Sequence, residues 1–177
     1  MEAQQFGALF GPYMPPDGQW QALSDGTVER LDVNHSDRAV GIVLRLPRLA
    51  AAETLFAAEK EVAAALHMKT AAIRPRFPGE LLGVETSWLS LVEHLRRRNV
   101  AVNGTLDDAR FVLAESSLTV ECVHGGRNIL SATGTEGLLE TLIFEQFGRR
   151  VKVEFTGDDV PCDDEHNRQM QRQAEQQ

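Results

Sequence analysis

Residues 134 to 137, Gly-Thr-Glu-Gly, are the first candidate for chemistry in this chain, because they place two glycines three positions apart between two predicted helices. A glycine loop at the start of a helix brings backbone N–H groups close to phosphate, and a lysine or arginine in the loop usually completes the contact. This loop holds the acid Glu136 and no cation. We therefore interpret it as a helix-breaking turn that needs glycine for its backbone.

Arginines and lysines elsewhere keep weak nucleic-acid binding open as an alternative. Arg96, Arg97 and Arg98 end a predicted helix, where the helix dipole favours cations, so we interpret them first as a solvated helix end. The other candidate contacts with nucleic acid or a partner are Arg74, Arg76, Arg127, Gly134, Gly137, Arg149, Arg150 and Lys152. The chain has a net charge of −8, so these cations would bind phosphate only if they gather on one face.

The sequence predicts no catalytic residue, no metal ligand and no cofactor. Its five histidines, at positions 35, 67, 94, 124 and 166, lack metal-ligand spacing. The carboxylate pair Asp107 and Asp108 lies in a predicted polar loop or helix start, where such groups serve as caps. Cys122 and Cys162 stand too far apart to suggest a metal knuckle, and Cys122 reads as a small core residue.

Composition indicates a globular protein of one ordinary domain or two small ones. The chain has 177 residues, of which 42% are hydrophobic and 25% charged. Its apolar runs are too short to cross a membrane and its start lacks the positive region of a signal peptide, so we expect a cytoplasmic protein. Residues 158–177 carry six acids against two arginines and show almost no apolar periodicity, which predicts an acidic flexible linker.

The first half of the chain alternates between strand and helix spacing. Residues 39–46 have apolar side chains at every second position, and residues 28–35 are their predicted partner strand, with a slip in the alternation between Val28 and Leu31. Residues 49–66 have helical spacing, and residues 71–78 alternate again with two prolines, which confine them to a sheet edge or to the end of a strand. After a Pro- and Gly-rich lead-in, residues 1–26, we predict a ββαβ subdomain over residues 27–84.

The second half predicts an αββααβ order over residues 85–157. The pattern predicts a helix with one apolar stripe over residues 85–99 and two strands over residues 108–114 and 117–123. It predicts about two helical turns over residues 127–133. A helix that closes at Gly148 and a strand over residues 151–155 complete it. This is the element order of a type II KH fold, so the predicted fold class is α+β with two small subdomains, the second KH-like.

Several stretches, taken together, resemble a known family. They are "DGTVERLDVNHSDRAVGIVLRLPRLAAAETLFAAEKEVAAAL", "IRPRFPGELL", "VNGTLDDARFVL", "LTVECVHGGRNIL" and "LLETLIFEQFGRRVKVEF". Over residues 27–157 they are similar to the N-terminal region of PolC-type DNA polymerase III alpha subunits, the replicative polymerases of low-GC Gram-positive bacteria. None of them is a catalytic signature. In that family the region precedes an OB-fold domain, a 3'-5' exonuclease and the polymerase core.

The resemblance implies a non-catalytic fragment of a DNA-directed DNA polymerase, a nucleotidyltransferase that acts in DNA replication. It implies a docking module for other replisome proteins, because fold relatives of this region include the alpha-binding domain of the clamp-loader tau subunit. We expect the fragment to be monomeric, without a membrane contact. The alternative is a weak single-stranded nucleic-acid binder of KH-like fold, and a stand-alone enzyme is a third hypothesis for which the sequence offers no nucleophile or base.

Overall fold

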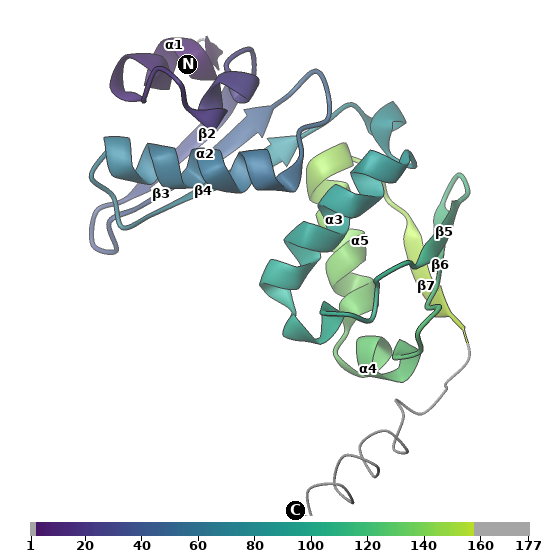
Figure 1. Cartoon of the computed structure of the whole chain (residues 1–177). Coiled ribbons are helices and arrows are strands. Elements are labelled where there is room, and N and C mark those ends of the chain that lie inside the picture. The colour runs from purple at the N-terminus through teal and green to yellow at the C-terminus, as the bar shows by residue number, and fades with distance from the viewer. Residues whose placement is uncertain (1–2, 158–177) are drawn as a thin grey trace, which may run out of the picture. The chain divides into compact units, whose positions relative to one another are not determined.

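The computed structural model describes residues 3–157, which form a mixed α+β fold with two small sheets (Figure 1). The chain divides into two compact units. Of the described residues, the first unit contains 3–94 together with Thr141–Arg150, and the second contains Leu95–Glu140 and 151–157. The predicted α+β class is therefore confirmed, while the units divide the chain elsewhere than at the expected boundary between residues 84 and 85.

The sheet of the first unit has the strand order β1-β2-β3-β4. Its strands are β1 (Gln4–Gln5), β2 (Thr27–Asn34), β3 (Ala39–Arg45) and β4 (Thr70–Arg76). Strand β2 pairs antiparallel with β3, and its register shifts between Val28 and Arg30, where the sequence alternation slips. Strand β4 pairs parallel with β3 and forms one edge of the sheet, as its prolines predict.

Helix α2 (Ala52–Ala65) connects the two parallel strands and lies along one face of the sheet (Figure 1). It begins three residues later than the apolar pattern suggests. Leu55, Ala58 and Val62 are buried on its sheet-facing side. Glu59 is buried with them, and its Oε1 accepts the backbone N–H of Ile73 at 2.8 Å. This carboxylate satisfies a donor on the outer edge of β4, a position where an unpaired strand invites association.

The Pro- and Gly-rich lead-in folds onto the same sheet. It forms α1 (Phe6–Phe10), the 3₁₀ turns η1 (Gly11–Tyr13) and η2 (Gln19–Leu23), and β1, which pairs with the first two residues of β2. Phe6, Phe10 and Leu23 are buried. The carboxylate of Glu61 on α2 accepts the backbone N–H groups of Gln19 and Trp20, so the lead-in is held by apolar burial and by hydrogen bonds to α2.

The remaining elements are the 3₁₀ turns η3 (Gly79–Leu81) and η4 (Val100–Val102), the helices α3 (Glu85–Arg98), α4 (Arg127–Ala132) and α5 (Thr135–Phe147), and the strands β5 (Arg110–Leu113), β6 (Ser117–Glu121) and β7 (Lys152–Thr156). The predicted apolar stripe of α3 is buried as expected: Trp88, Leu91, Val92 and Leu95. The element order of the second half matches the order predicted from sequence.

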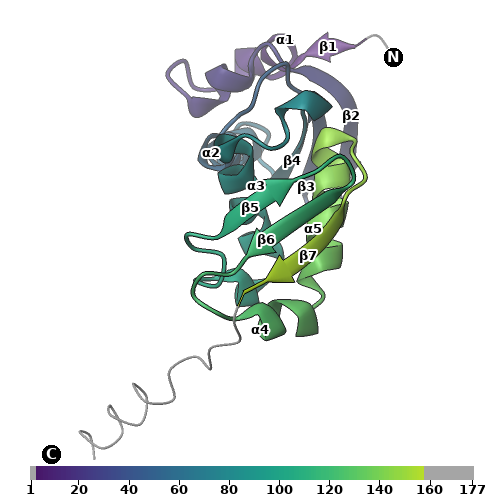
Figure 2. The ribbon, with the colours of Figure 1, turned by 90° about the vertical axis from the view of Figure 1, so that its right-hand side faces the viewer.

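The sheet of the second unit has the order β5-β6-β7, and Figure 2 shows its three strands side by side. Strands β5 and β6 are antiparallel, and β6 and β7 are parallel. Leu118, Val120, Val153 and Phe155 point into the core, as does Cys122 next to the end of β6. Glu140 of α5 accepts the backbone N–H of Val153 at 3.0 Å. A helical glutamate therefore caps an edge strand in this sheet also.

The Gly-Thr-Glu-Gly motif differs from its predicted role in one respect. Helix α5 begins at Thr135, so only Thr133 and Gly134 separate α4 from α5, and Glu136 and Gly137 already belong to the first turn of α5. Gly134 has a φ of 68°, a backbone conformation that favours glycine. Of the two glycines in the motif, the predicted need for glycine is therefore confirmed at Gly134 and not at Gly137. The predicted flexible linker, residues 158–177, lies outside the described residues, as does Cys162.

Candidate functional site

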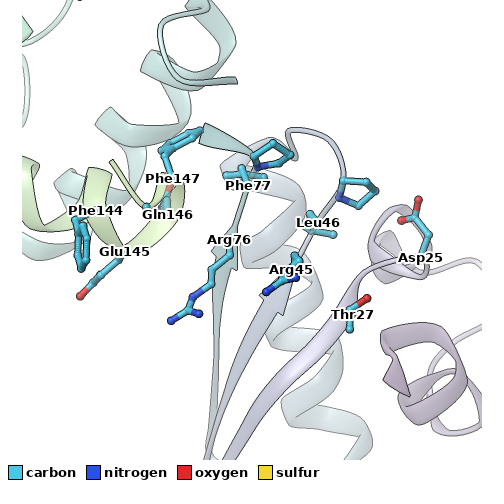
Figure 3. Close-up of a pocket in the computed structure, with 13 residues that line it drawn as sticks. Asp25, Thr27, Arg45, Leu46, Arg76, Phe77, Phe144, Glu145, Gln146 and Phe147 are labelled. Carbon is cyan, nitrogen blue, oxygen red and sulfur yellow. The ribbon is translucent and has the colours of Figure 1, made fainter. Parts of the chain in front are cut away.

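The first unit contains a pocket of about 600 Å³ where β3 and β4 end (Figure 3). We call it the strand-end pocket. It is lined by Asp25, Thr27, Arg45, Leu46, Pro47, Arg76, Phe77, Pro78, Phe144, Glu145, Gln146, Phe147 and Gly148. These residues come from the start of β2, the ends of β3 and β4, and the last turn of α5, so the pocket brings together four separate segments of the chain.

A short backbone contact holds β4 and α5 in place around the pocket. The N–H of Phe77 donates to the carbonyl oxygen of Gln146 at 2.6 Å, and the rings of Phe77 and Phe147 lie 5.5 Å apart between centroids. Both rings are almost fully buried. Gly148 ends α5 with a φ of 65°, and its N–H donates to Phe144, the C-cap that the sequence predicts. The apolar wall of the pocket is therefore rigidly built.

The carboxylate of Glu29 forms ion pairs with both arginines that line the pocket. Glu29 accepts from Arg45 through Oε1 and from Arg76 through Oε2, the latter at 2.9 Å. The side chain of Glu29 is 18% exposed, whereas those of Arg45 and Arg76 are 69% and 57% exposed. Figure 3 shows the two arginines extending to the same side from the ends of adjacent strands. The three groups together carry a net charge of +1.

An aromatic ring borders the arginines. Phe144 is 46% exposed, although large apolar side chains are normally buried, and the guanidinium carbon of Arg150 lies 4.9 Å from the centre of its ring. Figure 3 shows Phe144 and Glu145 extending from α5 to the same side as the two arginines. At this opening the pocket thus presents cationic and apolar groups next to each other.

Gln146 contributes a polar group without a partner. Its side chain is 3% exposed, and its Oε1 has no hydrogen bond within the part of the chain that the structure describes. A buried acceptor that lacks a donor costs about 1–3 kcal/mol. Departures of this kind from full hydrogen bonding are expected at functional or strained sites.

The glycine motif has a different environment. Asn99 donates through Nδ2 to the hydroxyl oxygens of Thr133 and Thr135, at 3.1 and 2.9 Å, and the two hydroxyls lie 2.9 Å apart. Glu136 accepts from the hydroxyl of Ser131. These contacts fix the turn between α4 and α5, and they place an anion on the first turn of α5.

The residues predicted as contacts for nucleic acid or a partner are distributed over both units. Arg74, Arg76, Arg149 and Arg150 belong to the first unit, and Arg96, Arg97, Arg98, Arg127, Gly134, Gly137 and Lys152 belong to the second. Arg76 pairs with Glu29 at 2.9 Å, Arg96 pairs with Asp107, and Lys152 pairs with Glu140 at 3.0 Å. These three cations are thus engaged by carboxylates of their own unit.

The Asp107 and Asp108 carboxylates do not cap a helix. Asp107 pairs with Arg96, and Asp108 lies 3.1 Å from Nε2 of His124. No group of three His, Cys, Asp or Glu side chains in residues 3–157 is arranged to hold a metal ion. No helix among these residues is both long and apolar enough to span a membrane.

Two titratable groups of the second unit have shifted pKa values. Burial raises the pKa of the Cys122 thiol, Arg127 opposes that effect and Glu136 adds to it, so Cys122 is a protonated core residue at neutral pH. The hydrogen bond from the Val153 N–H lowers the pKa of Glu140 against the opposing effect of burial, and Lys152 lowers it further. Glu140 is thus held in its charged form.

Sequence reasoning missed the pocket almost entirely. It singled out Arg76 as a possible cation, but not Glu29, Arg45, Phe144 or Gln146. The one available signal was the stretch "RLPR" at 45–48 and its counterpart "RFP" at 76–78, each an arginine, an apolar residue and a proline where a strand ends. In comparisons with protein-family models, curated proteins and solved structures, nothing matches this chain.

Proposed function

We propose that this chain is a non-catalytic docking module that binds a partner protein at the strand-end pocket. The observation that carries the proposal is the pocket itself, a cavity of about 600 Å³ whose lining includes an exposed phenylalanine and two exposed arginines. Exposed aromatic and arginine side chains are the residue types that contribute most to protein interfaces. The role agrees with the resemblance to the N-terminal region of PolC-type polymerase subunits, in which the partner would be another replisome protein.

The test compares capture by the wild-type chain with capture by Phe144→Ser. Immobilised protein is incubated with nuclease-treated bacterial extract, and a protein retained only by the wild type is then purified and titrated. We expect the substitution to weaken its binding at least about tenfold, because Phe144 is the exposed apolar anchor. Identical capture by both chains would contradict docking at this pocket. Phe111→Ser, on β5 in the second unit, is a matched control.

The alternative is weak binding of single-stranded nucleic acid by a KH-like module over residues 85–157. Its support is the αββααβ order with β5 and β6 antiparallel, β6 and β7 parallel, and a glycine pair where α4 meets α5. Glu136 weighs against it, because an acid stands on the helix turn that would face phosphate. Wild-type affinity for oligo(dT) in the micromolar range at physiological salt would favour this alternative over docking.

A further inference from the structure

We propose that the partner segment bound at the strand-end pocket is an acidic peptide, with a carboxylate at Arg45 and Arg76 and a neighbouring apolar side chain on Phe144. The inference rests on the proposed docking function and gives its ligand class. It follows from the charge, the apolar surface and the unpartnered acceptor of the pocket, each of which restricts the ligand in a different way.

The charge of the arginine pair selects a carboxylate. Each guanidinium has five N–H donors in a planar fork, and one carboxylate has only two oxygens to accept them. Glu29 gives one oxygen to Arg45 and the other to Arg76. The remaining donors face solvent on side chains that are 69% and 57% exposed. A second carboxylate can join this cluster and neutralise its net charge of +1, or can take the place of Glu29.

The apolar lining of the strand-end pocket favours a ligand with an apolar side chain next to that carboxylate. Phe144 presents 46% of its surface beside the arginines, and Leu46, Pro47 and Pro78 line the same pocket. Burying an exposed apolar side chain on such a surface stabilises a complex by roughly 25 cal/mol for each Å² removed from water. An aliphatic or aromatic residue adjacent to an Asp or Glu would contact the ring and the arginine pair together.

Gln146 favours a peptide over other anionic ligands. Its buried Oε1 has no donor among residues 3–157. A peptide carries a backbone N–H at nearly every residue, so one that enters the pocket brings the donor that this oxygen lacks. A phosphodiester brings acceptors only, and would leave Gln146 unsatisfied.

The arrangement also differs from a nucleic-acid groove. Such grooves combine several aromatic faces for stacking with cations that follow the backbone. Here Phe77 and Phe147 are buried, Phe144 already has Arg150 over its ring, and the carboxylates of Asp25 and Glu145 line the pocket. A nucleic acid would bring a phosphate with every nucleotide beside these acids, whereas a peptide can place a carboxylate at the arginines and an apolar side chain elsewhere in the pocket.

The experiment titrates the whole chain with labelled peptides by fluorescence anisotropy. The probes are a peptide in which Asp and Glu flank a Leu-Phe pair, its Asn and Gln counterpart, its Lys counterpart, and oligo(dT). The variants are Glu29→Gln, Arg76→Gln and the control Arg30→Gln, which removes the same charge from an arginine paired with Asp32 outside the pocket. Thermal unfolding confirms that each variant folds.

We expect the acidic peptide to bind most tightly of the four probes. Arg76→Gln should weaken its binding about tenfold, because it removes a direct charged contact. Arg30→Gln should change the affinity less than about twofold, because a distant exposed charge is screened by salt. Glu29→Gln is the more decisive variant. It removes the carboxylate that competes with the peptide for Arg45 and Arg76, so it should raise the affinity for the acidic peptide several-fold. The proposal is overturned if the neutral peptide binds equally well, if Glu29→Gln weakens the acidic peptide, or if oligo(dT) binds more tightly than any peptide. Binding of the neutral peptide that is lost in Phe144→Ser would overturn the acidic ligand and leave docking intact.

Discussion

Arg76 donates through Nη1 to Oε2 of Glu29 at 2.9 Å, across a contact in which the arginine is more than half exposed and the glutamate is largely shielded. Exposed ion pairs contribute at most about 1 kcal/mol to stability, so this contact is a poor candidate for a structural role. Because Arg76 lines the strand-end pocket, we infer that the contact serves ligand binding rather than stability. Glu29 occupies donors of both arginines, so a ligand carboxylate would join this cluster or compete with Glu29 for those donors.

The Glu59 cap on β4 makes a first stability prediction. Glu59→Ala removes the acceptor of the Ile73 N–H inside the protein, so we expect the free energy of unfolding to fall by about 1–3 kcal/mol. Glu59→Gln keeps an acceptor oxygen and should lose less. Denaturant titration measures both variants, and light scattering tests whether the uncovered edge of β4 promotes association of the Ala variant. Equal stability of the wild type and Glu59→Ala would show that the cap is dispensable.

The Glu140 cap on β7 makes a prediction about pH. Its folded-state pKa lies below the ordinary value, so its charged form stabilises the fold above the unfolded pKa of about 4.3, and that contribution is lost as the pH falls through the folded pKa. Glu140→Gln should therefore be less stable than the wild type at neutral pH. The difference should shrink as the pH is lowered below that region. A difference that stays constant or grows on acidification, in chemical unfolding followed at several pH values, would contradict the assignment.

The two glycines of the Gly-Thr-Glu-Gly motif should respond to alanine with opposite signs. Gly134 has a φ of 68°, so Gly134→Ala should destabilise the fold by about 1–2 kcal/mol. Gly137 lies in the first turn of α5 with open space around its Cα, so Gly137→Ala should stabilise the fold by about 0.5 kcal/mol. Thermal unfolding of the two variants compares them directly. Destabilisation by both substitutions would show that the second glycine is needed for its backbone as well.

Glu136 decides whether the second unit can bind phosphate. Glu136→Lys replaces an anion on the first turn of α5 by a cation, and we expect a measurable gain in affinity for oligo(dT) at low salt. One added contact steepens the log–log salt dependence by about one unit, so the titration covers several salt concentrations. The control is Glu154→Lys, which makes the same charge change on an exposed position of β7. Equal gains in the two variants would reflect net charge, and the motif would then be a turn only.

Local patterns in the sequence predicted most elements because each element is encoded by neighbouring residues. Alternation located β3 and β7, the stripe from Trp88 to Leu95 located α3, and the slip after Val28 located the register shift in β2. The lead-in was harder, because Phe6 and Phe10 are buried although the prolines and glycines around them leave no apolar periodicity. The burial of Glu59 could not be predicted from the sequence. A carboxylate on the inner face of α2 is explained only by the N–H of Ile73 on β4, which it accepts.

The pocket could not be predicted for a related reason. Arg45, Arg76 and Gln146 are far apart in the sequence, and no spacing rule connects them. They meet because β3 and β4 are parallel, so the residues after both strands leave the sheet at the same end, where α5 also terminates. The exposed arginines that the sequence did offer as contacts, at the end of α3 and after α5, carried no information about which of them share a site.

The central claim is that the chain docks a partner segment at the strand-end pocket, and amide NMR of the labelled whole chain tests it most directly. Titration with the acidic Leu-Phe peptide should shift the signals of Arg45, Arg76, Phe77 and residues 144–148, and leave those of residues 127–137 unchanged. The same titration with Glu29→Gln should reach saturation at lower peptide concentration. Shifts confined to residues 127–137, or no shift at residues 144–148 at saturating peptide, would contradict docking at this pocket.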